Sequence, residues 1–515
     1  MNFAITAVLL LAAGIWPVFA SAEQSQPRRP NIVFIMTDQH RWDCVGANGN
    51  RLIRTPHLDQ LAREGANFTH AFVNAPVCVP SRASFFTGRY PHSHKNRVNY
   101  TPLDRREVLM QARLREAGYS TAAIGKLHLH PPTVQEAKRT GFDHVELHDA
   151  VRSLDPYSDY IAWRKERDPT AKNVYHRLLA KNIPAGRNPF RQAIDEKFTE
   201  TTWVGERTRH YIKTLSQGEK PFFIFSSFWK PHSPFEVPAP YDSLYDDVTI
   251  PLPAERTLQD IRLLPPPLRL LILRGRPQFG MDRDRLQWIY RSYYGAISHI
   301  DREVGRIMEA LKEAGQVENT IIVFSSDHGD QLLEHGLMGK NCFFEASVRV
   351  PLIFHAPGRI RPGKHNHLVE SVDVLPTLFE LAGLPEPYEN QGRSLAPLIG
   401  TTGRDYLPKE AIFCENVIPE VITSGSLKFE FEKGAGIKGI RHPDARMVRT
   451  RHWKFNYYPE GYAELYDLRK DPGEMKNLAD SPGHREIVLE MRERLLHWLI
   501  TADETDQIAP RWLRP

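Results

Sequence analysis

Cys78 is the strongest candidate nucleophile in the sequence, because of the residues around it. It begins the segment Cys-Val-Pro-Ser-Arg at residues 78–82, and Thr-Gly-Arg follows at residues 87–89. Pro80 can open a helix in its first turn and Gly88 can close it. Cys78 would then lie just before a helix N-terminus, where backbone N–H groups and the helix dipole stabilise an anion. A cysteine there has a lowered pKa and is reactive. A buried structural thiol and half of a disulfide are the alternatives.

Charged and polar side chains also follow four predicted strands. Short apolar runs at residues 31–36, 121–124, 221–228 and 320–324 indicate buried strands. In open α/β sheets, ligands bind beyond the carboxyl ends of the strands. Four strand ends rich in Asp, Lys and His therefore predict one convergent polar site, which favours an enzyme over a binding or scaffold protein. The residues concerned are Asp38, Gln39, Lys126, His128, His232, Asp327 and His328.

The elements that must position these residues alternate between strands and helices. A fifth apolar run at residues 351–355 adds a strand, and residues 284–314 carry apolar side chains at helical spacing up to Gly315. This alternation predicts an α/β fold with a large mixed, mainly parallel sheet flanked by helices. Two irregular regions rich in Pro and Arg, residues 131–191 and 251–277, are either substrate-facing loops or surface padding.

The two ends of the chain have distinct patterns. Residues 1–22 are uncharged and apolar and end in Ala20-Ser21-Ala22, which predicts a signal peptide and an exported protein, periplasmic or secreted. A membrane anchor is the alternative, but Pro17 interrupts a run shorter than the ~20 residues of a span, so stable membrane insertion is not expected. We predict a catalytic domain at residues 23–400 and a small C-terminal domain at 401–515, with an antiparallel sheet and a closing helix.

Charge and cysteine content exclude several classes of function. The 515 residues include 67 basic and 62 acidic side chains, a net charge of +5, which gives no basis for nucleic-acid binding. The four cysteines are widely spaced and form no CxxC pair, so zinc-ligand and thioredoxin-type sites are not expected. In an oxidising compartment they could instead form two disulfides.

Several of these segments together resemble the sulfatase family. The Cys-x-Pro-Ser-Arg run at residues 78–82 is similar to the sulfatase signature, which a formylglycine-generating enzyme reads to oxidise the cysteine to formylglycine (3-oxoalanine). Residues 125–128, Gly-Lys-Leu-His, resemble the family's Gly-Lys-x-His element, and residues 326–329 its second metal loop. Residues 464–468 resemble its C-terminal domain. The resemblance covers nearly the whole mature chain and implies an alkaline-phosphatase/sulfatase-like fold.

The resemblance also implies a mechanism and a metal. One hydroxyl of hydrated formylglycine 78 would attack sulfur, and the second would then lose its proton as sulfate is released. The implied metal ligands are Asp38, Gln39, the modified Cys78, Asp327 and His328. Oxygen ligands suit a divalent metal such as Ca²⁺, with Mg²⁺ or Mn²⁺ as alternatives.

The other catalytic assignments follow from the same resemblance. Arg82 and Lys126 would hold the formylglycine oxygens and one sulfate oxygen, and His128 would be the base that triggers sulfate release. His232 and Lys340 would hold the sulfate and protonate the leaving oxygen. Other charged residues are expected to be structural or at the surface: Lys230, His40, His92 and His94 as surface or loop residues, Asp43 and Asp330 as capping or structural residues, with His335 undecided.

Two positions depart from the commonest sulfatase pattern. Gln39 stands where a second Asp is usual, and His328 stands where Asn is usual. Both features resemble the phosphonate monoester hydrolase and phosphodiesterase branch of the superfamily. The sequence thus predicts a hydrolase that removes sulfate from a sulfated carbohydrate, such as a glycosaminoglycan, or from a small sulfate ester. A phosphohydrolase is the alternative, and intact Cys78 and Lys340 argue against a catalytically silent binding protein.

Overall fold

The computed structural model describes residues 29–502, except residues 100, 150–157, 169–189, 193, 255, 257, 275–282, 401–403, 418–443 and 460. The predicted signal peptide, residues 1–22, lies outside this range. Among the described residues, no helix combines the length and the apolar character that a membrane crossing requires.

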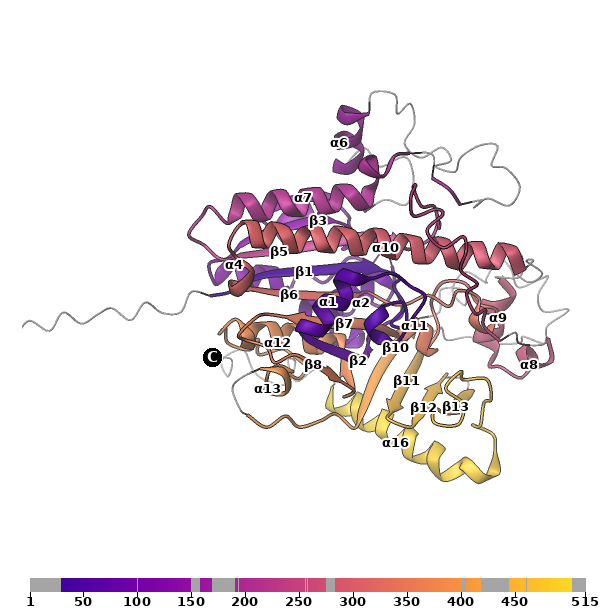
Figure 1. Ribbon diagram of the computed structural model, residues 1–515. Helices are drawn as coiled ribbons and strands as arrows, with labels where there is room; N and C mark the ends of the chain where they lie inside the picture. Colours follow the sequence, from indigo (N-terminus) through magenta and orange to yellow (C-terminus); the bar gives the residue numbers. More distant parts are fainter. Residues whose placement is uncertain are drawn as a thin grey trace, which may run out of the picture.

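A nine-stranded sheet forms the centre of the molecule (Figure 1). Its order is β4-β3-β5-β1-β6-β7-β2-β8, and β9 pairs with β2. The strands from β4 to β6 are parallel, whereas β7 runs antiparallel to both of its neighbours. The bounds are β1 Asn31–Asp38, β2 Ala66–Phe72, β3 Ser120–Gly125, β4 His144–Leu147, β5 Phe222–Pro231, β6 Thr320–Ser326, β7 Arg349–His355, β8 Gly363–His365 and β9 Val369–Glu370.

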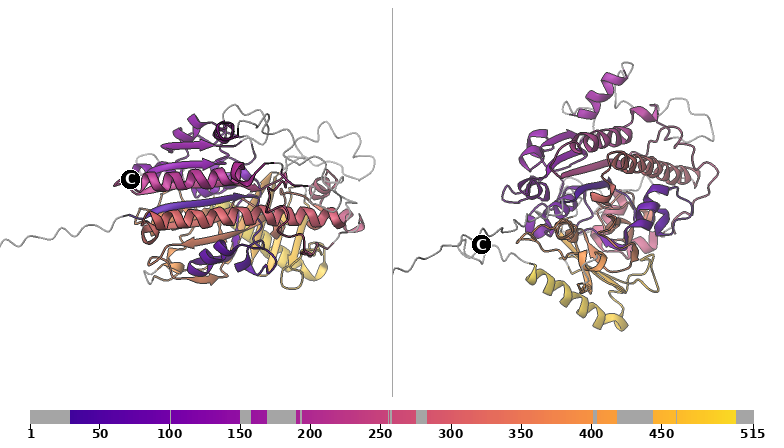
Figure 2. Two further views of the ribbon diagram at one scale, coloured as in Figure 1. Left: turned by 45° about the horizontal axis from the view of Figure 1, so that its top comes forward. Right: turned by 60° about the vertical axis from the view of Figure 1, so that its left-hand side comes forward.

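Helices cover both faces of this sheet, as the alternation of strands and helices predicts. Side chains at alternate positions of β1 enter two different cores, Val33 and Ile35 on one face and Phe34 and Met36 on the other. The first face is covered by α1 (Pro56–Glu64), α7 (Glu200–Leu215) and α10 (Arg283–Glu313), of which α7 and α10 lie side by side (Figure 2). The second face is covered by α2 (Cys78–Thr87), α4 (Met110–Glu116), α5 (Val134–Arg139) and α12 (Val374–Leu381).

A second, four-stranded antiparallel sheet lies towards the C-terminus, with the order β10-β11-β12-β13. The bounds are β10 Ala411–Val417, β11 Asp444–Thr450, β12 Trp453–Tyr457 and β13 Ala463–Asp467. The closing helix α16 (Arg485–Thr501) packs on this sheet through Val488, Met491, Leu495 and Trp498. The predicted fold class, with its small C-terminal sheet and helix, is therefore confirmed. The domain boundary near residue 400 stays a prediction.

The five predicted strands and the long helix are present within a few residues of their expected ends. The two irregular regions contain short elements where they are described: α5, β4 and α6 (Asp159–Arg167) in the first, and α8 (Leu258–Arg262) and α9 (Pro266–Arg274) in the second. Among the described residues, the remaining short α-helices are α3 (Pro91–His94), α11 (Glu345–Val348) and α13 (Ala396–Ile399).

Candidate active site

Four neighbouring parallel strands bring their carboxyl ends to one edge of the sheet. Asp38 is the last residue of β1, Lys126 follows β3, His232 follows β5, and Asp327 follows β6. Because β3, β5, β1 and β6 are adjacent in the sheet, these four residues converge as the sequence predicts. A tight turn at the end of β3 places Lys126 at this edge of the sheet. Gly125 has a φ of 89°, and a Cβ there would lie 1.9 Å from the carbonyl oxygen of Ser227.

Cys78 is brought to the same edge by helix α2. It is the first residue of this helix rather than the residue before it, and Gly88 follows the helix end with a φ of 68°. The thiol is buried, and its Sγ lies 2.9 Å from Lys340 Nζ and 3.2 Å from His328 Nε2. Burial and Asp38 would raise the pKa of this thiol, but Lys340, Lys126 and His328 lower it well below its usual value. The surroundings of Cys78 therefore stabilise an anion.

Two buried cations hold the carboxylates of the site. Arg82 Nε lies 2.9 Å from Asp327 Oδ2, and Arg82 Nη2 lies 3.4 Å from Asp38 Oδ2. Lys126 Nζ forms an ion pair with the same oxygen of Asp38. Burial raises the pKa of Asp38, but Lys126 and the other nearby cationic groups bring it well below its usual value. Asp38 is therefore ionised although it is fully buried.

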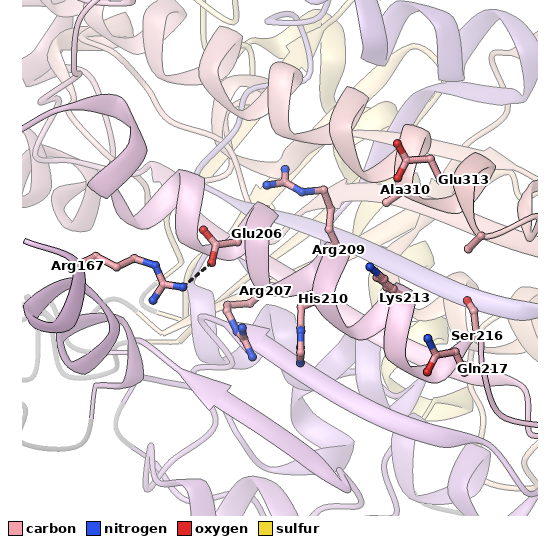
Figure 3. Close-up of a pocket in the computed structure, with 11 residues that line it drawn as sticks. Arg167, Glu206, Arg207, Arg209, His210, Lys213, Ser216, Gln217, Ala310 and Glu313 are labelled. Carbon is pink, nitrogen blue, oxygen red and sulfur yellow. Dashed lines mark hydrogen bonds and ion pairs between the residues drawn. The ribbon is translucent and has the colours of Figure 1, made fainter.

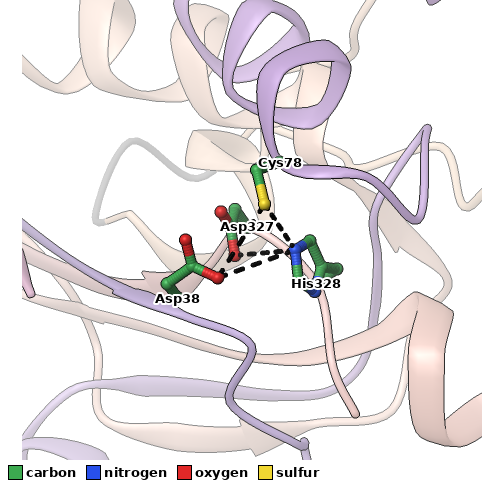
Figure 4. Close-up of side chains that lie close together, drawn as sticks. All are labelled: Asp38, Cys78, Asp327 and His328. Atoms are coloured by element: carbon green, nitrogen blue, oxygen red, sulfur yellow. Dashed lines mark hydrogen bonds and ion pairs between the residues drawn. The ribbon is translucent and has the colours of Figure 1, made fainter. Parts of the chain in front are cut away.

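Four side chains form a donor set that fits a divalent cation (Figure 4). Asp38, Cys78, Asp327 and His328 each offer one ligand atom, these atoms lie within 4.8 Å of one another, and all four residues are buried. With ligand distances of about 2.0–2.6 Å, one ion could contact all of them. Two carboxylate ligands suit a hard cation, and the imidazole extends the choice to a transition metal.

Gln39 and Lys340 lie directly beside this donor set. Lys340 Nζ is 2.9 Å from Gln39 Oε1 and 4.0 Å from Asp38 Oδ1. Burial lowers the pKa of Lys340, but Cys78, Asp38 and Asp327 raise it above its usual value. Lys340 is therefore a charged proton donor within the site. The amide oxygen of Gln39 accepts from Lys340, and its role as a metal ligand stays a prediction.

Two histidines of the predicted set have lowered pKa values. Burial, Lys126 and Arg82 lower the pKa of His128 well below its usual value, and its Nδ1 has no hydrogen-bond partner among the described residues. Its backbone N–H donates to Asp149 Oδ1 at 2.9 Å. Burial and Lys340 lower the pKa of His232 to about 3. A neutral His128 can accept a proton, whereas His232 can donate one only after a bound anion has raised its pKa.

The structure corrects several of the minor expectations. Lys230 is half-buried rather than solvated, with Nζ 3.5 Å from Glu236 Oε2. His40 and His94 are buried in the interior, and burial lowers their pKa values to about 4 and about 3. All four cysteines lie in the described part of the chain and are free, so the disulfide alternative for Cys78 is wrong.

Other contacts of the site are missing from the predicted set. Ser227 Oγ lies 2.9 Å from Arg82 Nη1, and the backbone oxygen of Lys126 accepts from the same nitrogen. Tyr293 Oη donates to the backbone oxygen of Gln39 at 2.6 Å. Asn99 Oδ1 accepts the backbone N–H of Val79, in the first turn of α2. Ser227 lies within the predicted strand at residues 221–228, but no sequence pattern indicates Tyr293 or Asn99.

A hollow elsewhere in the molecule is not part of this site. It has a volume of about 820 Å³ and lies between the outer sides of α7 and α10, with Arg167 of α6 at its edge (Figure 3). Arg167 and Arg207 line it, but they are paired with Glu206 at 3.1 Å and with Glu146 at 2.7 Å. None of the predicted catalytic or metal-binding residues lines this hollow.

Family models and known proteins match this chain over most of its length. The sulfatase family model matches residues 30–384, and a model described as N-sulphoglucosamine sulphohydrolase, C-terminal, matches residues 430–500. An arylsulfatase of Clostridium perfringens is 31% identical over 508 residues, covering 92% of this chain and 95% of that protein. An N-acetylglucosamine-6-O-sulfatase of Bacteroides thetaiotaomicron is 28% identical, covering 92% of this chain and 87% of its own length.

A solved structure with the same fold belongs to the other branch of the superfamily. The phosphonate monoester hydrolase of Agrobacterium radiobacter is 26% identical, with a TM-score of 0.78 over 92% of this chain and 96% of that chain. The overlap includes both the central sheet and most of the C-terminal region, because it extends over nearly the full length of each chain.

Proposed function

This chain belongs to the sulfatase family, and from that premise we propose that it removes sulfate from a sulfated carbohydrate through a nucleophile formed at Cys78. It is an enzyme of the sulfuric ester hydrolase class.

The position of Cys78 is the observation that carries the proposal. Its Sγ lies at the first turn of α2, within 2.9 Å of Lys340 Nζ and 3.2 Å of His328 Nε2. The helix N-terminus and the Lys340 ammonium together stabilise negative charge at this point. A tetrahedral anion such as sulfate, and the charge that develops as its ester bond breaks, would be stabilised in the same way.

We propose that a formylglycine-generating enzyme converts Cys78 during maturation, which supplies a hydroxyl nucleophile after hydration. A divalent cation held by Asp38, Asp327, His328, residue 78 and Gln39 would polarise an oxygen of the substrate. The proposed cation is Ca²⁺, with Mg²⁺ or Mn²⁺ as alternatives.

The chain's own residues would handle the charges and protons. Arg82 and Lys126 fix Asp38 and Asp327 and offer positive charge beside residue 78. Lys340 is charged and adjacent to Cys78 Sγ, so it can hold a sulfate oxygen and protonate the leaving oxygen. His128 is neutral and can accept the proton that is lost when sulfate departs. His232 would contact the bound anion.

A sulfated glycan is the proposed substrate class for two reasons. The chain is similar over most of its length to an enzyme named for the removal of a 6-O-sulfate from N-acetylglucosamine. The predicted signal peptide at residues 1–22 would export the protein to the periplasm or beyond, where polymeric sulfate esters are met.

Sulfate release from defined oligosaccharides tests the substrate class. The mature chain would be incubated with heparan and chondroitin disaccharides that carry sulfate at single known positions, and free sulfate would be measured by ion chromatography. We expect release from one sulfate position and none from the matched Cys78→Ala variant. Release from no sulfated saccharide, with activity on small aryl sulfates intact, would contradict the carbohydrate assignment.

A phosphonate monoester hydrolase or phosphodiesterase is the second candidate function. Gln39 and His328 replace residues that are Asp and Asn in the commonest sulfatase pattern, which removes one negative charge from the cation site. A more positive site suits a phosphoryl transition state. The similarity to a phosphonate monoester hydrolase over 92% of this chain supports the same alternative.

A further inference from the structure

Asp330 forms a link between Gln39 and the loop that carries Lys340. Its Oδ2 accepts a hydrogen bond from Gln39 Nε2. Its Oδ1 accepts the backbone N–H groups of Leu332 at 2.8 Å and Gly339 at 3.0 Å. Asp330 is fully buried, so water does not substitute for these donors. It lies three residues beyond Asp327 but contributes no atom to the cation donor set.

The hydrogen bonds of Gln39 determine which way its amide points. The Gln39 amide nitrogen donates to Asp330, and its oxygen accepts from Lys340 Nζ at 2.9 Å. A lysine ammonium can only donate hydrogen bonds, so Lys340 requires the oxygen of this amide. The two ends of the amide are nearly equal in size, so no steric effect would select this orientation without these partners.

The same carboxylate also fixes the turn before Lys340. Leu332, Leu333 and His335 all have positive φ angles, 42°, 71° and 56°, which non-glycine residues rarely adopt. A bond from Leu332 and a bond from Gly339 to one oxygen tie the start and the end of this turn together. Lys340 directly follows Gly339, so the placement of its ammonium group depends on this closure.

We propose that Asp330 is a positioning residue that turns the oxygen of Gln39 towards the cation site and holds the loop that presents Lys340. The inference rests on the proposed function, in that the site is taken to bind a divalent cation. It assigns Asp330 a role beyond capping. It also explains why an amide at position 39 can serve where a carboxylate would otherwise supply the oxygen.

Substitutions at the two positions separate this role from simple stabilisation. In Asp330→Asn, the remaining oxygen can still accept Leu332 and Gly339, so the new NH₂ group faces Gln39. The Gln39 amide must then reverse and direct its NH₂ group at Lys340 and the cation. In Gln39→Glu, two carboxylates face each other. The double variant Asp330→Asn/Gln39→Glu restores a donor–acceptor pair with the original net charge, and an oxygen again faces Lys340.

Metal affinity of the full chain provides the test. Each protein would be co-expressed with a formylglycine-generating enzyme, stripped of metal, and titrated calorimetrically with Ca²⁺ and with Mn²⁺. Asp301→Asn is the matched control, because Asp301 is also a buried carboxyl that accepts two backbone N–H groups, from His57 and Leu58, but lies outside the site. Loss of an orienting partner typically weakens metal binding roughly 10- to 100-fold.

We expect that weakening in Asp330→Asn, unchanged affinity in Asp301→Asn, and recovery in the double variant. Equal affinities of wild type and Asp330→Asn, or a double variant as weak as Asp330→Asn, would overturn the inference while leaving the proposed cation site intact. Absence of binding to the wild type would overturn both. If Asp330→Asn does not fold, the double variant must still bind more tightly than Gln39→Glu, and equal affinities would overturn the inference.

Discussion

The buried carboxyl of Glu200 should make the free energy of unfolding depend on pH. Glu200 is the first residue of α7 and is only 8% exposed. One carboxyl oxygen accepts the backbone N–H of Trp229 at 3.3 Å, and the other has no hydrogen-bond partner among the described residues. Burial therefore raises the pKa of Glu200 from 4.5 to about 7, although Trp229 and Lys230 oppose this change.

The raised pKa makes stability depend on pH with a definite sign. Below the unfolded value of 4.5, both states hold the proton, and the carboxyl does not penalise folding. As pH rises towards 7, the unfolded chain ionises while the folded chain keeps its proton, so the free energy of unfolding falls. At about 1.36 kcal/mol for each pH unit between the two values, the loss totals about 3 kcal/mol.

Replacing Glu200 with Gln removes this loss while keeping the shape of the side chain. We expect Glu200→Gln to be more stable than the wild type by about 3 kcal/mol near pH 8, and by less than about 1 kcal/mol near pH 5. Urea unfolding of both proteins at each pH, at fixed metal concentration, measures the difference. Glu309→Gln, which alters an exposed glutamate of α10, is the control. A difference between wild type and Glu200→Gln that does not change with pH would refute the reasoning.

Three further predictions concern the site itself. Arg82→Met should lower the free energy of unfolding by about 3–5 kcal/mol, measured by urea denaturation, because it removes the positive partner of buried Asp327; a change below about 1 kcal/mol would contradict this. Lys340→Met should lower kcat/KM for an aryl sulfate by roughly 10²- to 10³-fold. In unmatured protein the same change should raise the pKa of the Cys78 thiol, so that iodoacetamide alkylation begins at higher pH than in the wild type. Removal of metal with a chelator should abolish activity, and added Ca²⁺ or Mn²⁺ should restore it; activity that survives stripping would contradict the cation's role.

The central strands could be predicted because parallel strands that are covered on both faces bury every side chain and therefore consist of continuous apolar runs. Residues 31–36 are an example, and all eight residues of β1 are buried. Strand β2 escaped prediction because Asn67, Thr69 and His70 interrupt its apolar pattern. Strand β2 is stabilised by its pairing with β7. The register of this pairing shifts between Phe68 and Ala71 of β2. Such pairing depends on residues almost 300 positions away in the sequence.

The residues of the candidate site were recognisable where they form short motifs, but their mutual contacts were not. Gln39 and Asp330 are 291 residues apart, and Gln39 and Lys340 are 301 residues apart. The pairing of β1 with β6 brings the segments after these strands together, and without it Asp330 looked like an ordinary capping residue. Lys230 was expected in solvent because a lone lysine usually lies there, yet the turn after β5 brings Glu236 to within 3.5 Å of its Nζ.

A paired hydrolysis assay tests the central claim most directly. The mature chain would be given an aryl sulfate and an aryl phosphodiester with the same leaving group, and kcat/KM would be measured for each, with Cys78→Ala as the blank. We predict a much larger kcat/KM for the sulfate than for the phosphodiester, and loss of sulfate hydrolysis in Cys78→Ala. A preference for the phosphodiester would contradict the sulfatase assignment and move the protein to the phosphohydrolase branch. Full sulfatase activity in Cys78→Ala would contradict the role of residue 78 as the nucleophile.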